Sequence, residues 1–363
     1  MSKVTPAEFL AENSCMDLES RVPVAPLVDT RYLSSLQNRE VRDLYGPDFL
    51  WPGGVLNSRA QIEGLDRHGY DIVLAGSQVK YGKRRVVKKS DAGWILEDEY
   101  GGTAIAPPDD TPRSRESAVS GSDDLNRLTA PDFDDGRLEH LNFISETVDS
   151  DVFLLAGVPE SPFSFASYLR GPRNFMLDLT KNEDFVGELL EFTTEVSLKM
   201  VDSLAQYSID GVWIGDGLAT GSLISPDTYR KWVLPHLKRI VNRAHEKRLP
   251  VFYHVCGKTS ELIEPIADSG VDVFEVDSPD NSGLQLSEVL ERTSHKETVI
   301  KGNIDPLLIA NVEEEKIRRT TRERIREAEG SGRFILSSGC FLPTETPPEN
   351  VQAMTDEAKK LTG

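Results

Sequence analysis

Short apolar runs rich in β-branched and aromatic residues recur along the chain, and helical patterns follow them. This alternation is typical of βαβ units and predicts a parallel sheet covered by helices. The predicted strands are Val22–Asp29, Tyr70–Gly76, Asp151–Val158, Gly211–Gly217, Pro250–Cys256, Val271–Ser278, Thr298–Asp305 and Arg333–Gly339. Eight parallel strands, each with its helix, make a (β/α)8 barrel, so we expect an α/β fold of the TIM-barrel class.

Two long segments between predicted strands, Asn182–Tyr207 and Pro226–Lys247, carry apolar residues at steps of three to four. This periodicity predicts helices of the outer ring of the barrel. A Ser or Thr before Pro marks a helix start, and Gly after a helical run marks a helix end. Such signals stand at Ser225–Pro226, Thr346–Pro347, Gly270 and Gly330.

One stretch, Ser77–Leu138, interrupts the alternation. Its pattern predicts a β-hairpin inserted after the second strand, and its Pro-, Asp-, Ser- and Gly-rich second half predicts an exposed loop. At this end of a barrel the insertion would overhang the site as a lid or docking element, or it is a surface loop without a role. We expect one domain over residues 1–363, with residues 1–21 as an N-terminal extension.

Charge and composition narrow the classes of function. The net charge of −19 disfavours nucleic acid and anionic membranes, which both need concentrated Lys and Arg. No window approaches the ~20 apolar residues of a membrane span, and the acidic, polar start does not match a signal peptide. We therefore expect a cytoplasmic protein. Whether it is a monomer or a homodimer stays open.

The chain has three cysteines, Cys15, Cys256 and Cys340, too few for a disulfide framework. His254 and Cys256 are two residues apart, so in a strand their side chains share a face at its carboxyl end, where barrel enzymes place their sites. In the last predicted strand Cys340 continues the alternate row that starts at Phe334, which we expect to face inward. Cys340 then reaches the same cavity.

One imidazole and two thiolates suit tetrahedral Zn2+ and leave one position for an exchangeable group. The pattern therefore predicts a zinc ion held by His254, Cys256 and Cys340 at the mouth of the barrel. The alternative is a packed histidine with buried thiols.

Two carboxylates, Glu275 and Asp277, share the parity of Val271 and Val273 and are expected to face the barrel interior. A buried carboxylate needs a metal, a cation or a hydrogen-bond donor. Asp277 lies nearer the strand end and is the candidate fourth zinc ligand, while Glu275 is a catalytic candidate or a group that orients His254. The alternative is that both accept hydrogen bonds from neighbouring loops.

Further polar residues stand at the ends of predicted strands. Asp216 and Asn303 are catalytic candidates, whereas Asp305 precedes Pro306 as in a turn into the next helix. The candidates for a substrate pocket are Asp29, Arg31, Tyr32 and Gln78.

Several of these residues lie in motifs that resemble the uroporphyrinogen decarboxylase superfamily. The motifs are His254-Val-Cys256-Gly257, Gly302-Asn303-Ile304-Asp305-Pro306, Gly339-Cys340 with Pro343, Thr346-Pro347 and Glu349-Asn350-Val351. Upstream, Ser161–Ser164, Leu169–Gly171 and Asp216–Pro226 are similar as well. The resemblance runs from about Val22 to the end and is weak across the insertion.

Two chemistries occur in that superfamily, and the first strand separates them. Decarboxylases carry an Arg-Gln-Ala-Gly-Arg-Tyr run there and an Asp after the second strand. Here Leu27–Tyr32 keeps only Arg31-Tyr32, and the second strand ends at Ser77-Gln78. The His-x-Cys and distant Cys instead resemble the zinc-dependent corrinoid methyltransferases, typified by the methylcobalamin:coenzyme M enzymes. A remoter relative, cobalamin-independent methionine synthase, has a carboxylate that falls by similarity on Asp277, where Asp replaces a longer Glu.

The resemblance implies a methyl transfer between a corrinoid and a small substrate in one-carbon metabolism. Zinc would bind the sulfur of a thiol acceptor, or it would polarise a methyl ether for O-demethylation by cob(I)alamin. The corrinoid would come from a partner protein or as free methylcobalamin. Tetrapyrrole decarboxylation is the alternative activity, and a non-enzymatic binding barrel is a further one.

Overall fold

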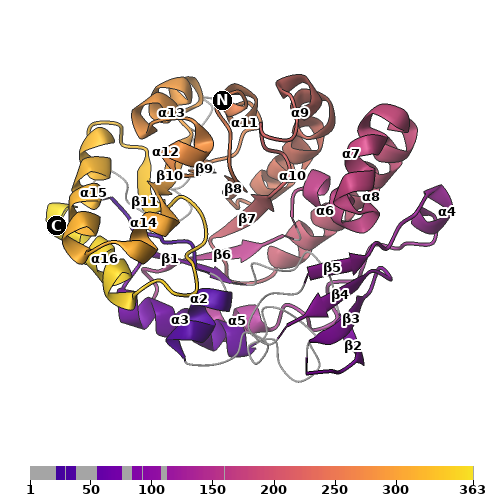
Figure 1. The fold of residues 1–363 in the computed structure, drawn as a ribbon, viewed down its shortest axis with the longest axis horizontal. Coiled ribbons are helices and arrows are strands. Elements are labelled where there is room, and N and C mark those ends of the chain that lie inside the picture. Colours follow the sequence, from indigo (N-terminus) through magenta and orange to yellow (C-terminus); the bar gives the residue numbers. More distant parts are fainter. Residues whose placement is uncertain are drawn as a thin grey trace.

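A computed structural model describes residues 22–28, 30–37, 55–75, 84–91, 93–107, 113–158 and 160–362. Seven parallel strands form one curled sheet in the order β1-β6-β7-β8-β9-β10-β11 (Figure 1). Their bounds are β1 (Ile72–Ala75), β6 (Phe153–Gly157), β7 (Gly211–Asp216), β8 (Val251–Val255), β9 (Val273–Val276), β10 (Val299–Ile304) and β11 (Phe334–Ser338). Each lies within a predicted run, so the predicted barrel class is confirmed.

The first predicted strand, Val22–Asp29, closes the ring between β11 and β1, although among its described residues only Val24 forms a β-bridge, with Leu336. On one side the amide of Leu336 donates to Pro23 O at 2.9 Å, and the amide of Ala25 donates to Leu336 O at 2.8 Å. On the other side the amide of Asp71 donates to Val24 O at 2.7 Å. Residues 22–28 therefore complete the sheet.

Helices surround the sheet, as Figure 1 shows. Before β7 they are α2 (Thr30–Leu36), α3 (Val55–His68), α4 (Ser122–Leu125), α5 (His140–Ser145), α6 (Pro162–Arg170), α7 (Pro172–Lys181) and α8 (Glu183–Leu204). After β7 they are α9 (Pro226–Trp232), α10 (Leu234–Glu246), α11 (Ile263–Ala267), α12 (Pro279–Ser282), α13 (Leu286–Arg292), the 3-10 helix η3 (Ser294–Lys296), α14 (Pro306–Asn311), α15 (Glu314–Glu327) and α16 (Pro348–Thr362). None of the helices in these described ranges is long and apolar enough to cross a membrane.

Three of the four helix signals act as expected. At the fourth, Thr346–Pro347, the helix α16 begins one residue later than predicted, at Pro348, and the Thr346 hydroxyl is buried without a hydrogen-bond partner. The Ser225 hydroxyl accepts a hydrogen bond from the Thr228 amide at the start of α9, and the Asp305 carboxylate accepts one from the Leu307 amide at the start of α14. Gly270 and Gly330 end helical runs at φ of +88° and +78°, a conformation that favours glycine. The predicted helix 226–247 is two helices, α9 and α10, with a proline in the first turn of α10.

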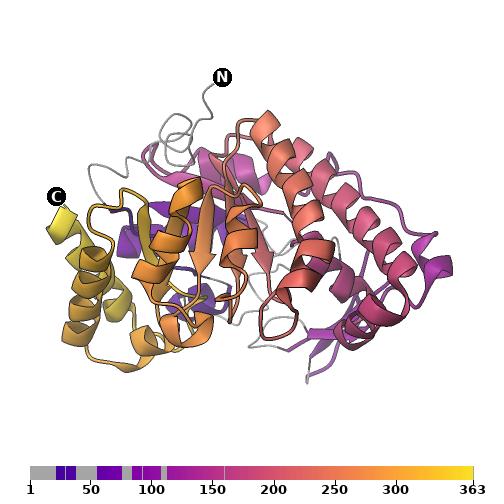
Figure 2. The same ribbon diagram turned by 90° about the horizontal axis from the view of Figure 1, so that it is seen from above.

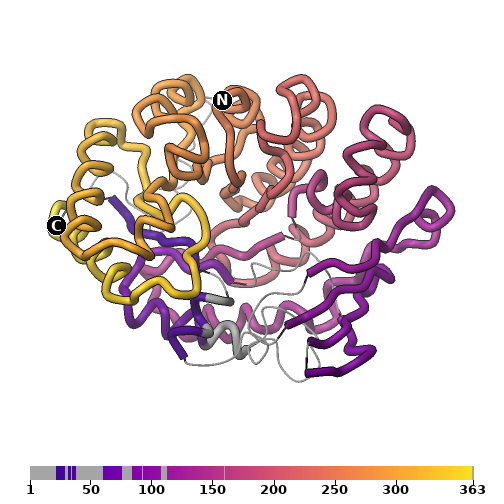
Figure 3. Tube along the Cα trace, viewed as in Figure 1, coloured from indigo at the N-terminus to yellow at the C-terminus, as the bar shows by residue number. Residues whose placement is uncertain are grey.

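Helices that are neighbours in the ring pack side by side. Figure 2 shows α8 and α10 running alongside each other, and Arg239 on α10 forms an ion pair with Glu191 on α8. Figure 3 shows the indigo helix α3 beside the yellow helix α16. The first and last barrel helices are therefore neighbours, as a closed ring requires.

The insertion is larger than a hairpin. Its four antiparallel strands are β2 (Arg84–Lys88), β3 (Trp94–Asp98), β4 (Thr103–Ala106) and β5 (Arg113–Glu116), in the order β2-β3-β4-β5. The predicted hairpin stretch contains β2, β3 and most of β4, whereas the predicted loop contains β5 and α4. The Tyr168 hydroxyl of α6 donates to Asp98 at 2.5 Å, and the Tyr100 ring packs on Phe165 and Phe192. The inserted sheet is therefore fixed to α6 and α8.

The core has two layers because strand side chains alternate between the two faces of the sheet. Most of the core lies between the sheet and the helices. The barrel interior is filled by a second buried cluster of Ala25, Ile72, Leu74, Phe153, Leu155, Trp213, Phe252, Val273, Val299 and Ile335. Strand residues of the same parity as this second cluster therefore face the interior.

Candidate metal centre

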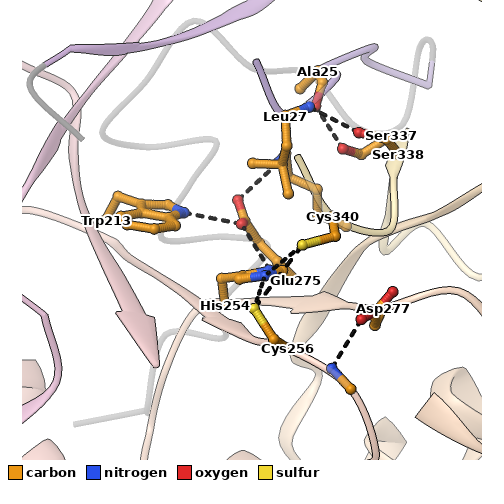
Figure 4. A network of polar contacts seen from close by, with 12 residues as sticks. Ala25, Leu27, Trp213, His254, Cys256, Glu275, Asp277, Ser337, Ser338 and Cys340 are labelled. Atoms are coloured by element: carbon orange, nitrogen blue, oxygen red, sulfur yellow. Dashed lines mark hydrogen bonds and ion pairs between the residues drawn. The ribbon is translucent and has the colours of Figure 1, made fainter. Parts of the chain in front are cut away.

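Three side chains meet at the carboxyl ends of the strands (Figure 4). His254 lies on β8, Cys256 directly follows that strand, and Cys340 follows β11. The Nε2 atom of His254 lies 3.3 Å from the sulfur of Cys256 and 3.7 Å from the sulfur of Cys340, and the two sulfurs are 4.0 Å apart. The structure thus brings together the three residues that the sequence proposed as ligands.

These separations fit a tetrahedral zinc ion. With Zn–S bonds of ~2.3 Å and a Zn–N bond of ~2.0 Å, a tetrahedron places the sulfurs ~3.8 Å apart and the nitrogen ~3.5 Å from each sulfur. A disulfide would instead need an S–S bond of ~2.05 Å. Among the described residues this is the one group of three or more possible ligands whose donor atoms lie within 4.8 Å of one another. The donor set and its spacing therefore suit zinc.

Cys340 reaches the centre by a route that differs from the predicted one. On β11 it is Ile335 that faces the interior, whereas Phe334 and Leu336 belong to the outer layer, so the predicted inward row is wrong. The chain turns after the strand at Gly339, whose amide donates to Ile304 O at 2.7 Å. A Cβ at Gly339 would overlap the backbone of Asp277, at 2.9 Å from its carbonyl carbon. This close approach brings Cys340 over the interior.

The end of β11 is held in place beside the first segment of the barrel. The Ser337 hydroxyl donates to Ala25 O at 2.6 Å, and the Leu27 amide donates to the Ser338 hydroxyl at 3.0 Å (Figure 4). Since Cys340 follows two residues later, these contacts fix the base of its loop.

Without a metal the two thiols differ in acidity. The hydrogen bond from the Cys256 thiol, with further help from His254, lowers the pKa of Cys340 to about 5 against the cost of burial. The same shared proton, together with burial, raises the pKa of Cys256 well above its ordinary value. One sulfur is therefore a thiolate at neutral pH, and a cation at the centre would favour loss of the second proton.

Glu275 lies on the far side of the His254 ring. Its Oε2 atom is 3.6 Å from His254 Nδ1 and accepts a hydrogen bond from the Trp213 indole N–H at 2.9 Å. Its Oε1 atom accepts one from the Lys301 ammonium at 2.8 Å. All four side chains are buried. The inward orientation predicted for Glu275 is therefore confirmed, and its partners are a cation and an indole.

Asp277 turns away from the three ligands, as Figure 4 shows. One carboxylate oxygen accepts from the Gly257 amide at 2.8 Å, and the other accepts from the Ser278 amide at 2.7 Å and from Asn281 Nδ2 at 3.2 Å. This arrangement matches the alternative in which the carboxylate accepts hydrogen bonds from neighbouring loops. It fixes the backbone directly after Cys256.

Asp216, a predicted catalytic residue, faces the layer between the sheet and the helices. It has the parity of Val212 and Ile214, which lie in the outer core, whereas Trp213 faces the interior. Its buried carboxylate accepts hydrogen bonds from the Ser164 hydroxyl at 2.5 Å, the Tyr253 hydroxyl at 3.0 Å and the Ala219 amide at 3.0 Å. Burial raises the pKa of Asp216, and these donors oppose the rise. The structure thus gives it a role in joining β7 to α6.

The other predicted residues are placed as follows. Asn303 on β10 is 1% exposed, and both polar atoms of its amide are buried without a hydrogen-bond partner. Tyr32 is buried beneath the helices, with its hydroxyl 3.0 Å from His68 Nε2, and is not part of the centre. Asp29 and Gln78 lie outside the described residues, as does the side chain of Arg31.

Sequence reasoning missed two residues of the centre, Trp213 and Lys301. Lys301 shares the inward parity of Val299 on β10, and Trp213 on β7 is the register partner of the inward-facing Phe252 on β8. The alternation rule that identified Glu275 therefore also applied to them. The Trp213 ring stacks on the His254 ring at 6.2 Å between centroids, with an interplanar angle of 18°. Together with Glu275 they line a cavity inside the barrel, whose other walls are apolar side chains such as Leu74 and Leu155.

Known proteins resemble this chain in fold and in sequence. A solved structure of a methyltransferase from Methanosarcina mazei is similar to the chain with a TM-score of 0.77 and 19% sequence identity, and covers 99% of this chain and 100% of its own, which shows the fold. The methylcobamide:CoM methyltransferase MtbA of Methanosarcina acetivorans is 27% identical over 247 residues, which are 66% of this chain and 69% of that protein. The methylcobamide:CoM methyltransferase MtaA of Methanosarcina barkeri is 25% identical over 244 residues, 67% of each chain.

A sequence profile of one protein family matches more than half of the chain. The profile described as uroporphyrinogen decarboxylase (URO-D) matches residues 94–361, which include the inserted strands from β3 onward and every residue of the candidate centre. This chain belongs to the uroporphyrinogen decarboxylase (URO-D) family.

Proposed function

We propose that this protein is a zinc-dependent methyltransferase that moves a methyl group between a corrinoid and a small thiol or methyl ether. The observation that carries the proposal is the convergence of His254 Nε2 and the sulfurs of Cys256 and Cys340 within 4.0 Å of one another. The similarity to two methylcobamide:CoM methyltransferases supports it.

Within this proposal the three ligands have defined tasks. When bound, zinc would act as a Lewis acid that lowers the pKa of a substrate thiol or polarises a methyl-ether oxygen. His254 binds through Nε2 and keeps its proton on Nδ1, which faces Glu275. Cys256 and Cys340 contribute thiolates, and a three-residue set leaves a fourth position for the substrate.

Neighbouring residues shape the surroundings of the ligands. Phe341 follows Cys340, and its ring lies 6.2 Å from His254 and 6.1 Å from Trp213. These rings limit the access of water to the imidazole, which strengthens electrostatic interactions at the centre. Asp277 holds the Gly257 amide and so positions Cys256 through the backbone.

Asn303 is the described residue that best suits a substrate contact. It offers one donor group and one acceptor, both buried and unpaired, and such groups are costly unless a ligand or water satisfies them. Asp29, Arg31 and Gln78 remain proposed contacts on the strength of their sequence positions. For Tyr32 and Asp216 the observed hydrogen bonds support roles in packing.

The corrinoid is proposed to arrive on a partner protein or as free methylcobalamin. The ligands lie at the carboxyl ends of the strands, the end at which barrel enzymes bind their substrates. The inserted sheet β2–β5 follows the carboxyl end of β1, so we propose it as a docking element for a carrier protein.

The test follows the absorbance of the cobalt. Enzyme is mixed with methylcobalamin and a panel of thiols, or with cob(I)alamin and methyl ethers, and we expect a cobalt spectral change with at least one pair. Cys256→Ala serves as the inactive control, and Cys15→Ala as the matched active control. Release of carbon dioxide from uroporphyrinogen without methyl transfer would overturn the proposal in favour of a decarboxylase.

A further inference from the structure

The buried ion pair between Lys301 and Glu275 stands directly behind the proposed zinc ligand His254. The Lys301 side chain is 3% exposed and the Glu275 side chain 2%, with 2.8 Å between Nζ and Oε1. Burying such a pair costs desolvation energy that mutual attraction does not always repay. A pair at this position therefore calls for a reason other than stability.

We propose that Lys301 and Trp213 are positioning residues that hold the Glu275 carboxylate against Nδ1 of His254, so that Glu275 acts on the metal through the imidazole and is not itself a ligand. This inference rests on the proposed zinc site and adds to it the residues that control its affinity.

Geometry is the first support. The carboxylate oxygens face two fixed donors, the ammonium of Lys301 on one side and the indole N–H of Trp213 on the other. Oε2, which the indole holds, is also the oxygen nearest to His254 Nδ1, at 3.6 Å. The ligand group of His254, Nε2, points the opposite way, toward the two sulfurs. The carboxylate is thus anchored on the side of the ring away from the metal position.

The sheet holds the pair in this orientation. Lys301 and Glu275 are register partners on the adjacent strands β10 and β9, and Glu275 is in turn the partner of His254 on β8. Three neighbouring strands therefore present the three side chains in one inward-facing row. Such a row leaves the carboxylate little freedom to swing toward the sulfurs.

Charge balance is an independent support. Two thiolates and the Glu275 carboxylate carry three negative charges, which Zn2+ and the Lys301 ammonium would balance with three positive ones. The nearby Asp277 carboxylate adds a further negative charge, which the amides of Gly257 and Ser278 and the side chain of Asn281 stabilise. Loss of Lys301 would leave the buried Glu275 carboxylate without the cation that holds its Oε1 atom. The carboxylate would then no longer be fixed beside Nδ1 of His254.

The test measures zinc affinity by competition with a chromophoric chelator, which does not depend on enzyme activity. The variants are Lys301→Met, Glu275→Gln and the double variant, and circular dichroism checks that each is folded. We expect each single change to weaken zinc binding by about 10- to 100-fold, the usual effect of removing a partner of a metal-bound histidine. Because both act through one carboxylate, the double variant should bind zinc as tightly as Glu275→Gln alone.

Three outcomes would overturn the inference: wild-type affinity in Lys301→Met, effects that add in the double variant, or tighter zinc binding in Lys301→Met. The last would mean that a released Glu275 becomes a fourth ligand, and the absorption bands of the cobalt-loaded protein would report the added oxygen. If Lys301→Met does not fold, the same cycle with Trp213→Phe replaces it, since this change removes the N–H donor and retains a ring. Failure of the wild type to bind zinc would instead reject the proposed function.

Discussion

The sulfur atoms of Cys256 and Cys340 lie 4.0 Å apart, although 84 positions separate the two cysteines in the sequence. This distance is about twice the ~2.05 Å of a disulfide bond and close to the separation of two thiolates on one zinc ion. Since His254 Nε2 completes the triangle, each of the three side chains is expected to matter equally for metal retention.

We therefore predict that the purified protein carries about one zinc per chain and that Cys256→Ala or Cys340→Ala removes it. The loss of affinity should exceed the ~100-fold upper range seen for partners outside the ligand set. Elemental analysis after dialysis measures the ratio, and Cys15→Ala is the control that keeps the metal. Full zinc retention in either of the first two variants would refute the ligand assignment.

Asp277 provides a second prediction. Its oxygens accept three hydrogen bonds from nitrogen donors, so Asp277→Ala should lower the free energy of unfolding by about 1–3 kcal/mol, the penalty of leaving buried donors unpaired. Asp277→Asn keeps one acceptor oxygen and should retain zinc better than Glu275→Gln. Chelator competition on the two variants decides the point. A larger loss of zinc in Asp277→Asn would restore this residue as the fourth ligand predicted from strand parity.

The unpaired amide of Asn303 leads to a third prediction. Replacing it by leucine, of similar size, removes two unsatisfied buried groups and should raise the free energy of unfolding by about 1–3 kcal/mol. The same change should slow methyl transfer about tenfold or more, because a substrate contact is lost. Thermal melting and steady-state kinetics measure the two effects. A variant that is both less stable and fully active would show that the amide serves the fold.

His140 gives the protein a pH-dependent stability that is separate from the metal centre. Burial lowers its pKa from 6.5 to about 4, so the folded state takes up this proton later than the unfolded state as the pH falls. The contribution of neutral His140 to the free energy of unfolding is complete above about pH 6.5 and is lost as the pH falls toward 4. At pH 5 the loss is about 2 kcal/mol.

Urea unfolding of the metal-free protein at pH 7.5 and pH 5 tests this prediction. Between pH 7.5 and pH 5, the free energy of unfolding of His140→Gln should fall by about 2 kcal/mol less than that of the wild type. An equal loss in both proteins would assign the acid sensitivity to other groups.

Much of the fold and the central ligands could be predicted because buried parallel strands obey simple alternation. Applied to the sequence alone, that rule predicted that His254, Cys256 and Glu275 face the barrel interior. It also contained the information for Lys301, an isolated charge within an apolar strand, whose partner could not be known until β9 and β10 were paired in register.

Where alternation failed, the cause was the exact phase of the strand or the conformation after its end. On β11 the predicted row of inward-facing residues was shifted by one position from the observed row. Cys340 still reaches the centre because the chain turns at Gly339. Asp216 ends its strand on the opposite face from Trp213, where two hydroxyls and backbone amides surround it. The strand β5 was not predicted because it lies in a segment rich in turn-forming residues, where pairing with β4 decides the conformation.

The position of the two cysteines makes the proposed ion a cross-link as well as a reaction centre. Cys256 follows β8, and Cys340 follows β11, so an ion between them would tie together the ends of an arc that contains β9 and β10. Joining positions this far apart restricts the unfolded chain, as the closure of any long loop does. Removal of the metal should therefore loosen this one side of the ring before the rest, and retention of zinc would decide how long the barrel stays closed on heating.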